Sequence, residues 1–394
     1  MRAKTLFSFI QIKMASAAHE VEILLNGLFS SSSQRLRQID LEKKFHFIKE
    51  LGVGAYGSVL LVKDKESNQR MALKIMQKRK ISEKKFLMEF SVSSYLSSHP
   101  NIIRSFGMVF QTQDHFIFAQ EVAPLGDLFF LITPHVGLPE VKVKRCAMQI
   151  SSALEFISEI GLVHMDVKPE NILVFDQECH CVKITDFGLA RAKGTVIRFQ
   201  VGSTSYMAPE VCELTGEKKL AVDSTLDVWG FGVLLYLLIT GEFPWKVAMS
   251  KDKAFRRFVA WQSNTHCNDP PASWNKLSTC LWRMFRCLLA ADYSERSKST
   301  KILCYMGRCW KRDSTLTGQN QITGITSTSY ARDKDSLSNH PHRKESNLTS
   351  MSCHFVAQSS ASQLPGQCQD NAVCPLILMD DQISMFVGAE VEIT

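Results

Sequence analysis

The sequence predicts a two-lobed α+β fold, in which a small antiparallel β-sheet with one main helix precedes a larger, mainly helical lobe. Two observations predict it. Apolar stretches of strand length, separated by turns, fill residues 45–120 around a single helical stretch, whereas residues from about 125 to 308 carry long helical patterns. A sheet lobe followed by a helical lobe leaves a cleft between them, and ligands usually bind in such clefts.

In the first lobe, the pattern predicts a helix at Glu83–Leu96 and strands at residues 45–51, 58–62, 71–75, 102–110 and 115–120. The turn between the first two strands is a G-x-G-x-x-G-x-V motif that reads Leu51, Gly52, Val53, Gly54, Ala55, Tyr56, Gly57, Ser58 and Val59. Glycines let the backbone approach phosphate oxygens and offer N–H donors without an intervening Cβ. On its own, the motif is also compatible with a plain hairpin.

Lys74 lies in the third strand among the apolar residues Met71, Leu73 and Ile75. A charge in such a strand needs a partner. The candidates are the phosphates of a bound nucleotide and Glu89 in the following helix. The alternative for Glu89 is a solvated position on the helix surface.

The second lobe is predicted to be helical. Lys142–Ile160 places apolar residues along one side of a helix, and further helices are expected at Leu226–Ile239, Ala254–Trp261 and Leu277–Leu289. The segment Cys179-His180-Cys181 has no second ligand pair at zinc-like spacing, so its flanks are interpreted as a short hairpin.

The loop after the first of these helices holds Asp166, Lys168 and Asn171, and Asp186 follows in an Asp-Phe-Gly sequence. The first aspartate can orient a hydroxyl and accept its proton, and the lysine can neutralise a migrating phosphoryl group. Asn171 and Asp186 supply oxygen ligands that suit Mg²⁺. A lone Asp-Phe-Gly occurs by chance, but these residues together predict phosphoryl transfer.

The full set of motifs resembles a eukaryotic protein kinase over residues 45–306. Within the kinases, four segments resemble the Src-homology-3-binding serine/threonine kinase family: Phe118–Glu121, Gly137–Glu140, Val143–Cys146 and Phe175–Cys179. The kinase domain is therefore expected at residues 45–308, with lobes at about 45–120 and 125–308.

The resemblance implies an ATP site and a hinge between the lobes at Gln120–Ala123. Its expected lining comprises the glycine motif Leu51–Val59 with Ala72, Lys74, Glu89, Glu121, Ala123, Asp127 and Leu173. Gln120 stands where access behind the adenine is limited, a position that is commonly apolar. Asp127 is expected to bind a ribose hydroxyl, to cap the helix that starts at Leu128, or both.

Further implied roles are catalytic for Asp166, Lys168 and Asn171, and metal-binding for Asn171 and Asp186. A lysine two residues after the catalytic aspartate is typical of serine/threonine kinases. Glu210 is expected to pair with Arg296, and Asp227 to brace the catalytic loop. These last three residues are structural in the family.

The segment between Asp186 and Glu210 is expected to gate the substrate. Most similar kinases carry arginine before the catalytic aspartate, where it binds a phosphate on this segment, but this chain has Met165. Methionine offers no charge-assisted bond, so activity is expected not to require phosphorylation at Thr195 or elsewhere in the segment. The alternative is that Arg191, Lys193 or Arg198 receives a phosphate in place of Met165.

The predicted function is ATP- and Mg²⁺-dependent phosphorylation of serine and threonine on protein substrates. The first alternative is a pseudokinase scaffold, although no catalytic position is lost. The second is a small-molecule kinase, against which the substrate-positioning sequence at 203–210 argues.

Composition narrows the partners. The 394 residues are 45% hydrophobic and 22% charged, and 46 Lys+Arg against 39 Asp+Glu give a net charge of +7, which indicates a solvated basic exterior rather than nucleic-acid binding. No apolar run reaches the ~18 residues of a membrane span. Twelve scattered cysteines suit a reducing compartment, so a cytoplasmic location is expected.

The two flanks are expected to be disordered. Residues 1–44 contain a serine run and, at Val21–Leu28, a pattern compatible with a brief amphipathic helix. Residues 309–394 form a Ser/Thr-rich tail. None of the twelve prolines forms P-x-x-P, so a Src-homology-3 partner is doubtful here.

Overall fold

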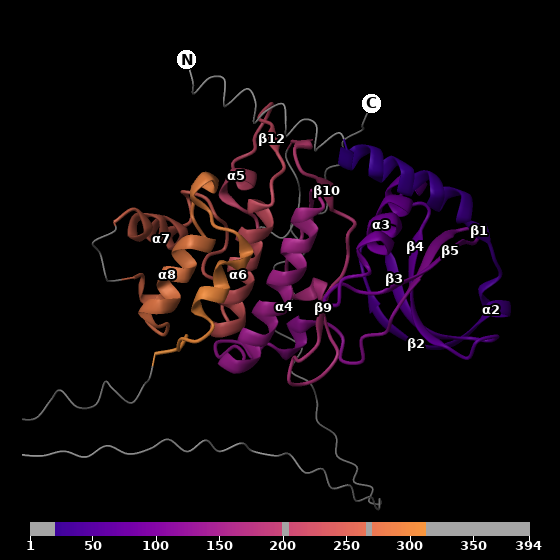
Figure 1. Cartoon of the computed structure of the whole chain (residues 1–394), viewed down its shortest axis with the longest axis horizontal. Coiled ribbons are helices and arrows are strands. Elements are labelled where there is room, and N and C mark those ends of the chain that lie inside the picture. Colours follow the sequence, from indigo (N-terminus) through magenta and orange to yellow (C-terminus); the bar gives the residue numbers. More distant parts are fainter. Residues whose placement is uncertain (1–19, 199–204, 265–269, 313–394) are drawn as a thin grey trace, which may run out of the picture. The chain divides into compact units, whose positions relative to one another are not determined.

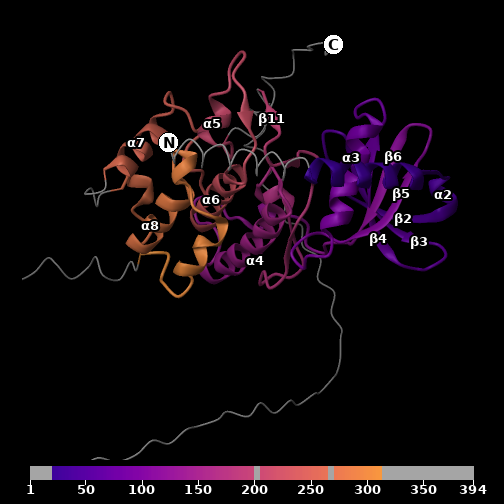
Figure 2. The same cartoon turned by 45° about the horizontal axis from the view of Figure 1, so that its top comes forward.

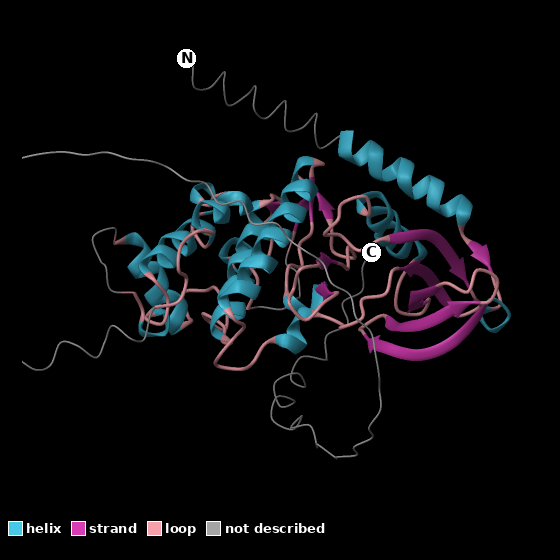
Figure 3. Ribbon diagram, turned by 60° about the horizontal axis from the view of Figure 1, so that its bottom comes forward, coloured by secondary structure: helices cyan, strands magenta, loops and turns pink. Residues whose placement is uncertain are grey.

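The computed structural model describes residues 20–198, 205–264 and 270–312 (Figure 1). Within these ranges a β-sheet lobe precedes a helical lobe, which confirms the predicted two-lobed α+β fold. Figure 3 shows the long strands gathered in one lobe and most helices in the other. The predictions for residues 1–19, for Ser203 and Thr204, and for the tail from residue 313 lie outside the described residues.

The first lobe is built on a six-stranded sheet with the order β1-β5-β6-β4-β3-β2 (Figure 2). Its strands are β1 (Arg37–Gln38), β2 (Phe45–Val53), β3 (Gly57–Asp64), β4 (Arg70–Gln77), β5 (Ser105–Gln111) and β6 (His115–Gln120). All neighbours pair antiparallel except β1, which runs parallel to β5. The five predicted strands are present, and the parallel edge strand β1 is an addition to the predicted antiparallel sheet.

The register of the sheet brings the glycine motif beside Lys74. Val59 on β3 lies opposite Lys74 on β4, and Lys74 lies opposite Phe118 on β6. Gly57 is required by the close approach of these strands, because a Cβ at this position would lie 1.8 Å from the carbonyl oxygen of Ile75.

Helix α3 (Glu83–Leu96) has the predicted bounds and packs on the sheet. The side chain of Ser82 caps it by accepting a hydrogen bond from the backbone N–H of Lys85. Phe86 stacks on Phe116 with ring centroids 4.9 Å apart. This aromatic packing fixes the position of the helix that carries Glu89.

The second lobe surrounds α6 (Thr225–Thr240), in which every residue from Leu226 to Thr240 is buried. A helix that is apolar on all sides lies inside a protein. The other long helices are α4 (Glu140–Glu159), α7 (Lys253–Ser263) and α8 (Thr279–Leu288), and the four predicted helices are thus confirmed to within about three residues.

Short elements complete the two lobes and their connections. The helical ones are α2 (Leu41–Lys44), α5 (Pro209–Cys212), η1 (Leu128–Leu131), η2 (Pro169–Asn171), η3 (Ala272–Trp274), η4 (Tyr293–Glu295) and η5 (Ser299–Tyr305). The strands form three antiparallel pairs: β7 (Leu162–Val163) with β10 (Arg191–Ala192), β8 (Ile172–Val174) with β9 (Val182–Ile184), and β11 (Val196–Ile197) with β12 (Leu220–Ala221).

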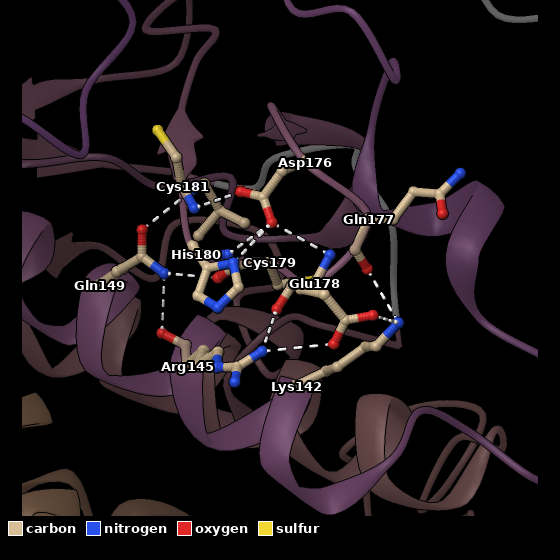
Figure 4. A network of polar contacts seen from close by, with 10 residues as sticks. Lys142, Arg145, Gln149, Asp176, Gln177, Glu178, Cys179, His180 and Cys181 are labelled. Carbon is tan, nitrogen blue, oxygen red and sulfur yellow. Dashed lines mark hydrogen bonds and ion pairs between the residues drawn. The ribbon is translucent and has the colours of Figure 1, made fainter. Parts of the chain in front are cut away.

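The Cys179-His180-Cys181 segment lies in the predicted hairpin, between β8 and β9. Figure 4 shows the network that ties it to α4. The carboxylate of Asp176 accepts hydrogen bonds from the backbone N–H groups of Glu178 and His180 through Oδ1 and of Cys181 through Oδ2. Gln149 on α4 donates to the carbonyl oxygen of Cys179. These contacts assign the segment a structural role.

The N-terminal flank differs from the prediction of disorder. Residues 20–35 are helical, and β1 follows them. The predicted brief helix at Val21–Leu28 is part of this longer helix. The physical reason is tertiary packing, since Val21 is only 8% exposed and Ser32 6%.

Candidate active site

The cleft between the lobes is lined by every residue that the sequence assigned to nucleotide, metal or catalysis: Leu51, Gly52, Val53, Gly54, Ala55, Tyr56, Gly57, Ser58, Val59, Ala72, Lys74, Glu89, Glu121, Ala123, Asp127, Asp166, Lys168, Asn171, Leu173 and Asp186. A Cβ built on Gly52 would contact nothing within 4 Å, and one on Gly54 only the carbonyl oxygen of Gly57 at 4.0 Å, so this loop leaves room for an approaching phosphate. The sequence did not identify Glu22 and Leu25, which also line the cleft.

Three charged side chains meet on the sheet side of the cleft. The Nζ atom of Lys74 lies 2.6 Å from Oε1 of Glu89 and 3.1 Å from Oδ2 of Asp186. Lys74 is placed by β4, Glu89 by α3, and Asp186 by the loop after β9. Glu89 is 4% exposed, so its carboxylate is a buried partner rather than a solvated helix residue.

Burial and mutual attraction shift the pKa values of these three groups in opposite directions. Burial raises the pKa of Glu89 to about 7, although attraction to Lys74 opposes this shift. Burial would lower the pKa of Lys74, but the two carboxylates raise it overall. Burial would raise the pKa of Asp186, but Lys74 lowers it overall. Lys74 therefore stays cationic and Asp186 anionic at neutral pH.

On the other side of the cleft, Asp166, Lys168 and Asn171 form one cluster. Oδ2 of Asp166 lies 2.9 Å from Nζ of Lys168 and accepts a 2.8 Å hydrogen bond from Nδ2 of Asn171. Asn171 also donates to the backbone carbonyl oxygen of Asp166, at 2.8 Å. Because Oδ2 takes both side-chain contacts, Oδ1 of Asp166 is left to accept a hydrogen bond from a substrate.

The residues directly before this cluster, His164 and Met165, are fixed by hydrogen bonds to Asp227. The buried carboxylate of Asp227 on α6 accepts backbone hydrogen bonds from His164 and Met165, at 2.7 and 2.8 Å. These bonds stabilise Met165 in the left-handed region, with φ of 71°. Asp227 thus has the bracing position predicted for it.

His164 links this loop to the residue before Asp186. Its Nδ1 accepts from the backbone N–H of Asp166 at 3.2 Å, and its Nε2 lies 3.0 Å from the carbonyl oxygen of Thr185. The two contacts together require the tautomer with hydrogen on Nε2. Asp186 itself has a φ of 65°, and the backbone N–H of Gly188 donates to its Oδ1 at 3.3 Å.

The hinge offers backbone groups rather than side chains. The side-chain oxygen Oε1 of Glu121 accepts hydrogen bonds from the backbone N–H of Arg104 at 2.7 Å and from Nζ of Lys183 at 2.6 Å. The backbone N–H of Glu121 donates to the carbonyl oxygen of Arg104. The carbonyl oxygen of Glu121 therefore remains for a ligand. Gln120 is 7% exposed and lines the cleft as predicted.

Asp127 does cap η1, because its Oδ1 accepts a 3.0 Å hydrogen bond from the backbone N–H of Phe129. It also lines the cleft, and burial raises its pKa. The capping role is confirmed, and the second carboxylate oxygen is left for a ligand hydroxyl.

The oxygen atoms of Asn171 and Asp186 fit a magnesium ion. Nδ2 of Asn171 makes both of its hydrogen bonds, which leaves the amide oxygen Oδ1 as a ligand atom, and Asp186 adds a carboxylate. Mg²⁺ is usually held by one or two protein oxygens together with substrate phosphates and water. The residues present therefore fit this ion.

Beyond the cleft, the predicted pair of Glu210 and Arg296 is confirmed. Nη1 of Arg296 lies 2.7 Å from Oε1 of Glu210 and Nη2 lies 3.0 Å from Oε2, and the arginine side chain is fully buried. This bidentate contact fixes the end of the gating segment.

Glu210→Ala should lower the free energy of unfolding by about 3 kcal/mol, because it leaves a buried guanidinium without its carboxylate. Urea denaturation followed by circular dichroism measures the change. Glu213→Ala, at an exposed position after α5, is the matched control and should stay close to the unsubstituted protein. Equal stability of the two variants would contradict the predicted role of the pair.

Comparison with known proteins agrees with this geometry. The protein kinase domain family matches residues 45–306. Serine/threonine-protein kinase SBK1 of Danio rerio is 42% identical over 298 residues, which are 76% of this chain and 77% of that protein. Serine/threonine-protein kinase SBK2 of Rattus norvegicus is 35% identical over 305 residues, which are 77% of this chain and 84% of that protein. Serine/threonine-protein kinase meng-po of Drosophila melanogaster is 33% identical over 292 residues, which are 74% of this chain and 63% of that protein.

The two lobes and the charged clusters that face one cleft define an ATP-dependent protein kinase. More narrowly, the chain belongs to the Src-homology-3-binding kinase family, to which the SBK1 and SBK2 relatives belong. The resemblance found in the sequence is confirmed at both levels. Among the described residues, none of the helices combines the length and apolarity needed to cross a bilayer.

Proposed function

We propose that this chain transfers the γ-phosphoryl group of ATP, bound with Mg²⁺, to serine and threonine hydroxyls of proteins. Serine/threonine kinase activity is supported by the family and by the names of the relatives. The observation that carries the residue assignment is the convergence of the Lys74 and Asp166 clusters on one cleft.

Each side chain has a separate task in this proposal. Asp166 orients the acceptor hydroxyl and accepts its proton through Oδ1, while Lys168 neutralises charge on the migrating phosphoryl group. Lys74, oriented by Glu89, binds the α- and β-phosphates. Asn171 and Asp186 would hold Mg²⁺, which would offset the negative charge of the phosphates.

The apolar lining and the hinge complete the nucleotide site. Ala72, Val59 and Leu173 enclose the adenine, and the carbonyl oxygen of Glu121 with the backbone of Ala123 provides its hydrogen-bond partners. Asp127 binds the ribose with the oxygen that does not cap η1. This arrangement leaves the γ-phosphate end toward Asp166.

An array of serine, threonine and tyrosine peptides, incubated with the purified full-length protein and Mg²⁺–ATP, tests the proposal. Incorporation at serine and threonine is the expected result, and the Asp166→Asn variant serves as the blank. Saturable nucleotide binding without incorporation would contradict it and would indicate a scaffold. Incorporation confined to tyrosine would contradict the acceptor class.

Location and partners follow from chemistry. The cytoplasm is proposed as the compartment, since every cysteine among the described residues is a free thiol, a state typical of reducing surroundings. A protein substrate is the proposed partner, with no nucleic acid. A Src-homology-3 partner stays doubtful, because the sequence contains no P-x-x-P.

Activity should not depend on phosphorylation of the gating segment. Met165 packs against the apolar core and offers no cation, while Lys193 already pairs with Asp223 at 2.8 Å and Arg191 donates to the carbonyl oxygen of Ala190. Phosphatase-treated protein and the Thr195→Ala variant should both keep most of their turnover in a peptide assay. A loss of more than about tenfold, or 1.4 kcal/mol of barrier, in either sample would contradict this prediction.

A further inference from the structure

The helix formed by residues 20–35 turns one side toward the kinase domain. Val21 and Ser32 are buried, and Leu25 and Leu28 between them are half-buried, at positions that follow helical spacing. Ile23 on another side is 59% exposed. Figure 1 shows this indigo helix beside α3, and Figure 3 shows it in the same relation from another direction.

Its contacts with α3 lie close to Glu89. The hydroxyl of Ser91, two residues beyond Glu89, is 2.7 Å from the hydroxyl of Ser32 and donates to the carbonyl oxygen of Leu28 at 3.3 Å. Ser91 and Ser32 are both buried, so these hydrogen bonds are shielded from water. Phe29 adds apolar contact with the cluster that includes residues of α3.

At its other end, the same helix contacts the helical lobe. Val21 belongs to the core of that lobe, and a Cβ built on Gly161 would lie 2.7 Å from Cγ2 of Val21. The carbonyl oxygen of Gly161 accepts a 2.8 Å hydrogen bond from the backbone N–H of Lys193, and β7 directly after it pairs with β10. This contact therefore lies at the base of the gating segment.

The helix is also anchored to the sheet. Arg35 donates from Nη2 to the carbonyl oxygen of Gly107 at 2.7 Å, and β1 pairs with β5. One short segment thus contacts the sheet, the helix that carries Glu89 and the start of the gating segment. Phosphoryl transfer requires the lysine–glutamate pair and the metal-binding aspartate to be in place together.

We propose that residues 20–38, termed the N-terminal brace, position α3 and the base of the gating segment so that Glu89, Lys74 and Asp186 meet. The brace takes the place of a phosphate on the gating segment, for which Met165 provides no partner. This inference rests on the proposed kinase function. Val21, Leu28 and Ser32, which contact Gly161 and α3, act as positioning residues, because they do not touch the reacting atoms.

The test compares Val21→Asp with Ile23→Asp in the full-length protein. Val21→Asp inserts a charge where the brace meets Gly161, whereas Ile23→Asp adds the same charge on the exposed side of the same helix. Val21→Asp should lower kcat by about tenfold or more, with a smaller effect on the peptide KM, because the brace contacts α3 and the base of the gating segment rather than its far end. Ile23→Asp and the conservative Val21→Ile should keep wild-type kcat.

Hydrogen exchange separates positioning from general unfolding. In Val21→Asp, amides of α3 should exchange faster while those of α6 stay protected. Wild-type kcat in Val21→Asp, or equal losses in the two aspartate variants, would overturn the proposal. If Val21→Asp still folds, an equal loss of protection in α3 and α6 would also overturn the proposal.

A second variant decides the matter if Val21→Asp does not fold. Ser32→Ala removes the hydroxyl bonded to Ser91 and should lower kcat about fivefold, the effect of one net hydrogen bond. An unchanged kcat in Ser32→Ala would overturn the proposal. A wild-type protein that phosphorylates no peptide would instead refute the proposed function, so the two failures are distinguishable.

Discussion

Asp166→Asn should lower kcat by about 10²-fold or more and leave ATP affinity nearly unchanged. The carboxylate oxygen Oδ2 already accepts from Lys168 and Asn171. The amide oxygen of asparagine can keep both contacts, so the loop should hold its shape. The amide nitrogen then occupies the place of Oδ1, and it cannot accept the proton of the acceptor hydroxyl.

Steady-state kinetics with a serine peptide, together with nucleotide binding by calorimetry, measures both quantities. Asp114→Asn, in an exposed turn outside the cleft, is the matched control and should keep wild-type turnover. An unchanged kcat in Asp166→Asn would place the base elsewhere. So would a defect confined to ATP binding.

Much of the site could be predicted because local pattern and chemistry coincide there. Lys74 stands in an apolar strand, and Glu89 lies on the helix that follows it. Because a buried charge needs a partner, the sequence predicts that these two side chains pair. The bounds of α3 follow from Ser82 as a cap and from its apolar residues.

Contacts between distant segments could not be predicted in this way. The side chain of Glu121 is held by Lys183, which lies 62 residues further along the chain, and no local pattern announces the pair. The left-handed backbone conformation of Met165 and Asp186 could not be predicted from the sequence either, because glycine is the usual residue at such φ values. The buried carboxylate of Asp227 stabilises the first of them from outside the loop.

The N-terminal brace was missed for a related reason. Its inward side combines Val21, Leu25 and Leu28 with Ser32, and Ser32 belongs to a serine run at residues 30–33, where helix propensity is low. A helix of this kind is stable mainly through tertiary contacts. Those contacts lie on α3 and Gly161, far away in the sequence, so single-sequence periodicity suggested only a short helix.

Lys74→Met should abolish phosphoryl transfer and leave the fold intact. Methionine is close to lysine in length and packs well in an apolar strand, so the volume of β4 is nearly conserved. Removing the ammonium group takes away the cation that is proposed to bind the α- and β-phosphates. It also takes away the shared partner of Glu89 and Asp186, which lie 2.6 and 3.1 Å from Nζ.

The fold should survive because Glu89 can take up a proton. Burial already raises its pKa to about 7, and attraction to Lys74 is what opposes that rise. Without the lysine the pKa should rise further, so Glu89 is neutral at pH 7 and no unpaired buried charge remains. Asp186 is 42% exposed at its side chain and can be solvated instead.

The measurement pairs a kinase assay with circular dichroism and thermal unfolding at pH 7. Lys78→Met, at the turn after β4, removes a lysine whose Nζ donates to Gln111 and should keep turnover. Wild-type turnover in Lys74→Met would refute the assignment of the phosphate-binding cation. A folded, inactive Lys74→Met beside an active Lys78→Met would show that the charge at position 74 serves the reaction, because the fold persists without it.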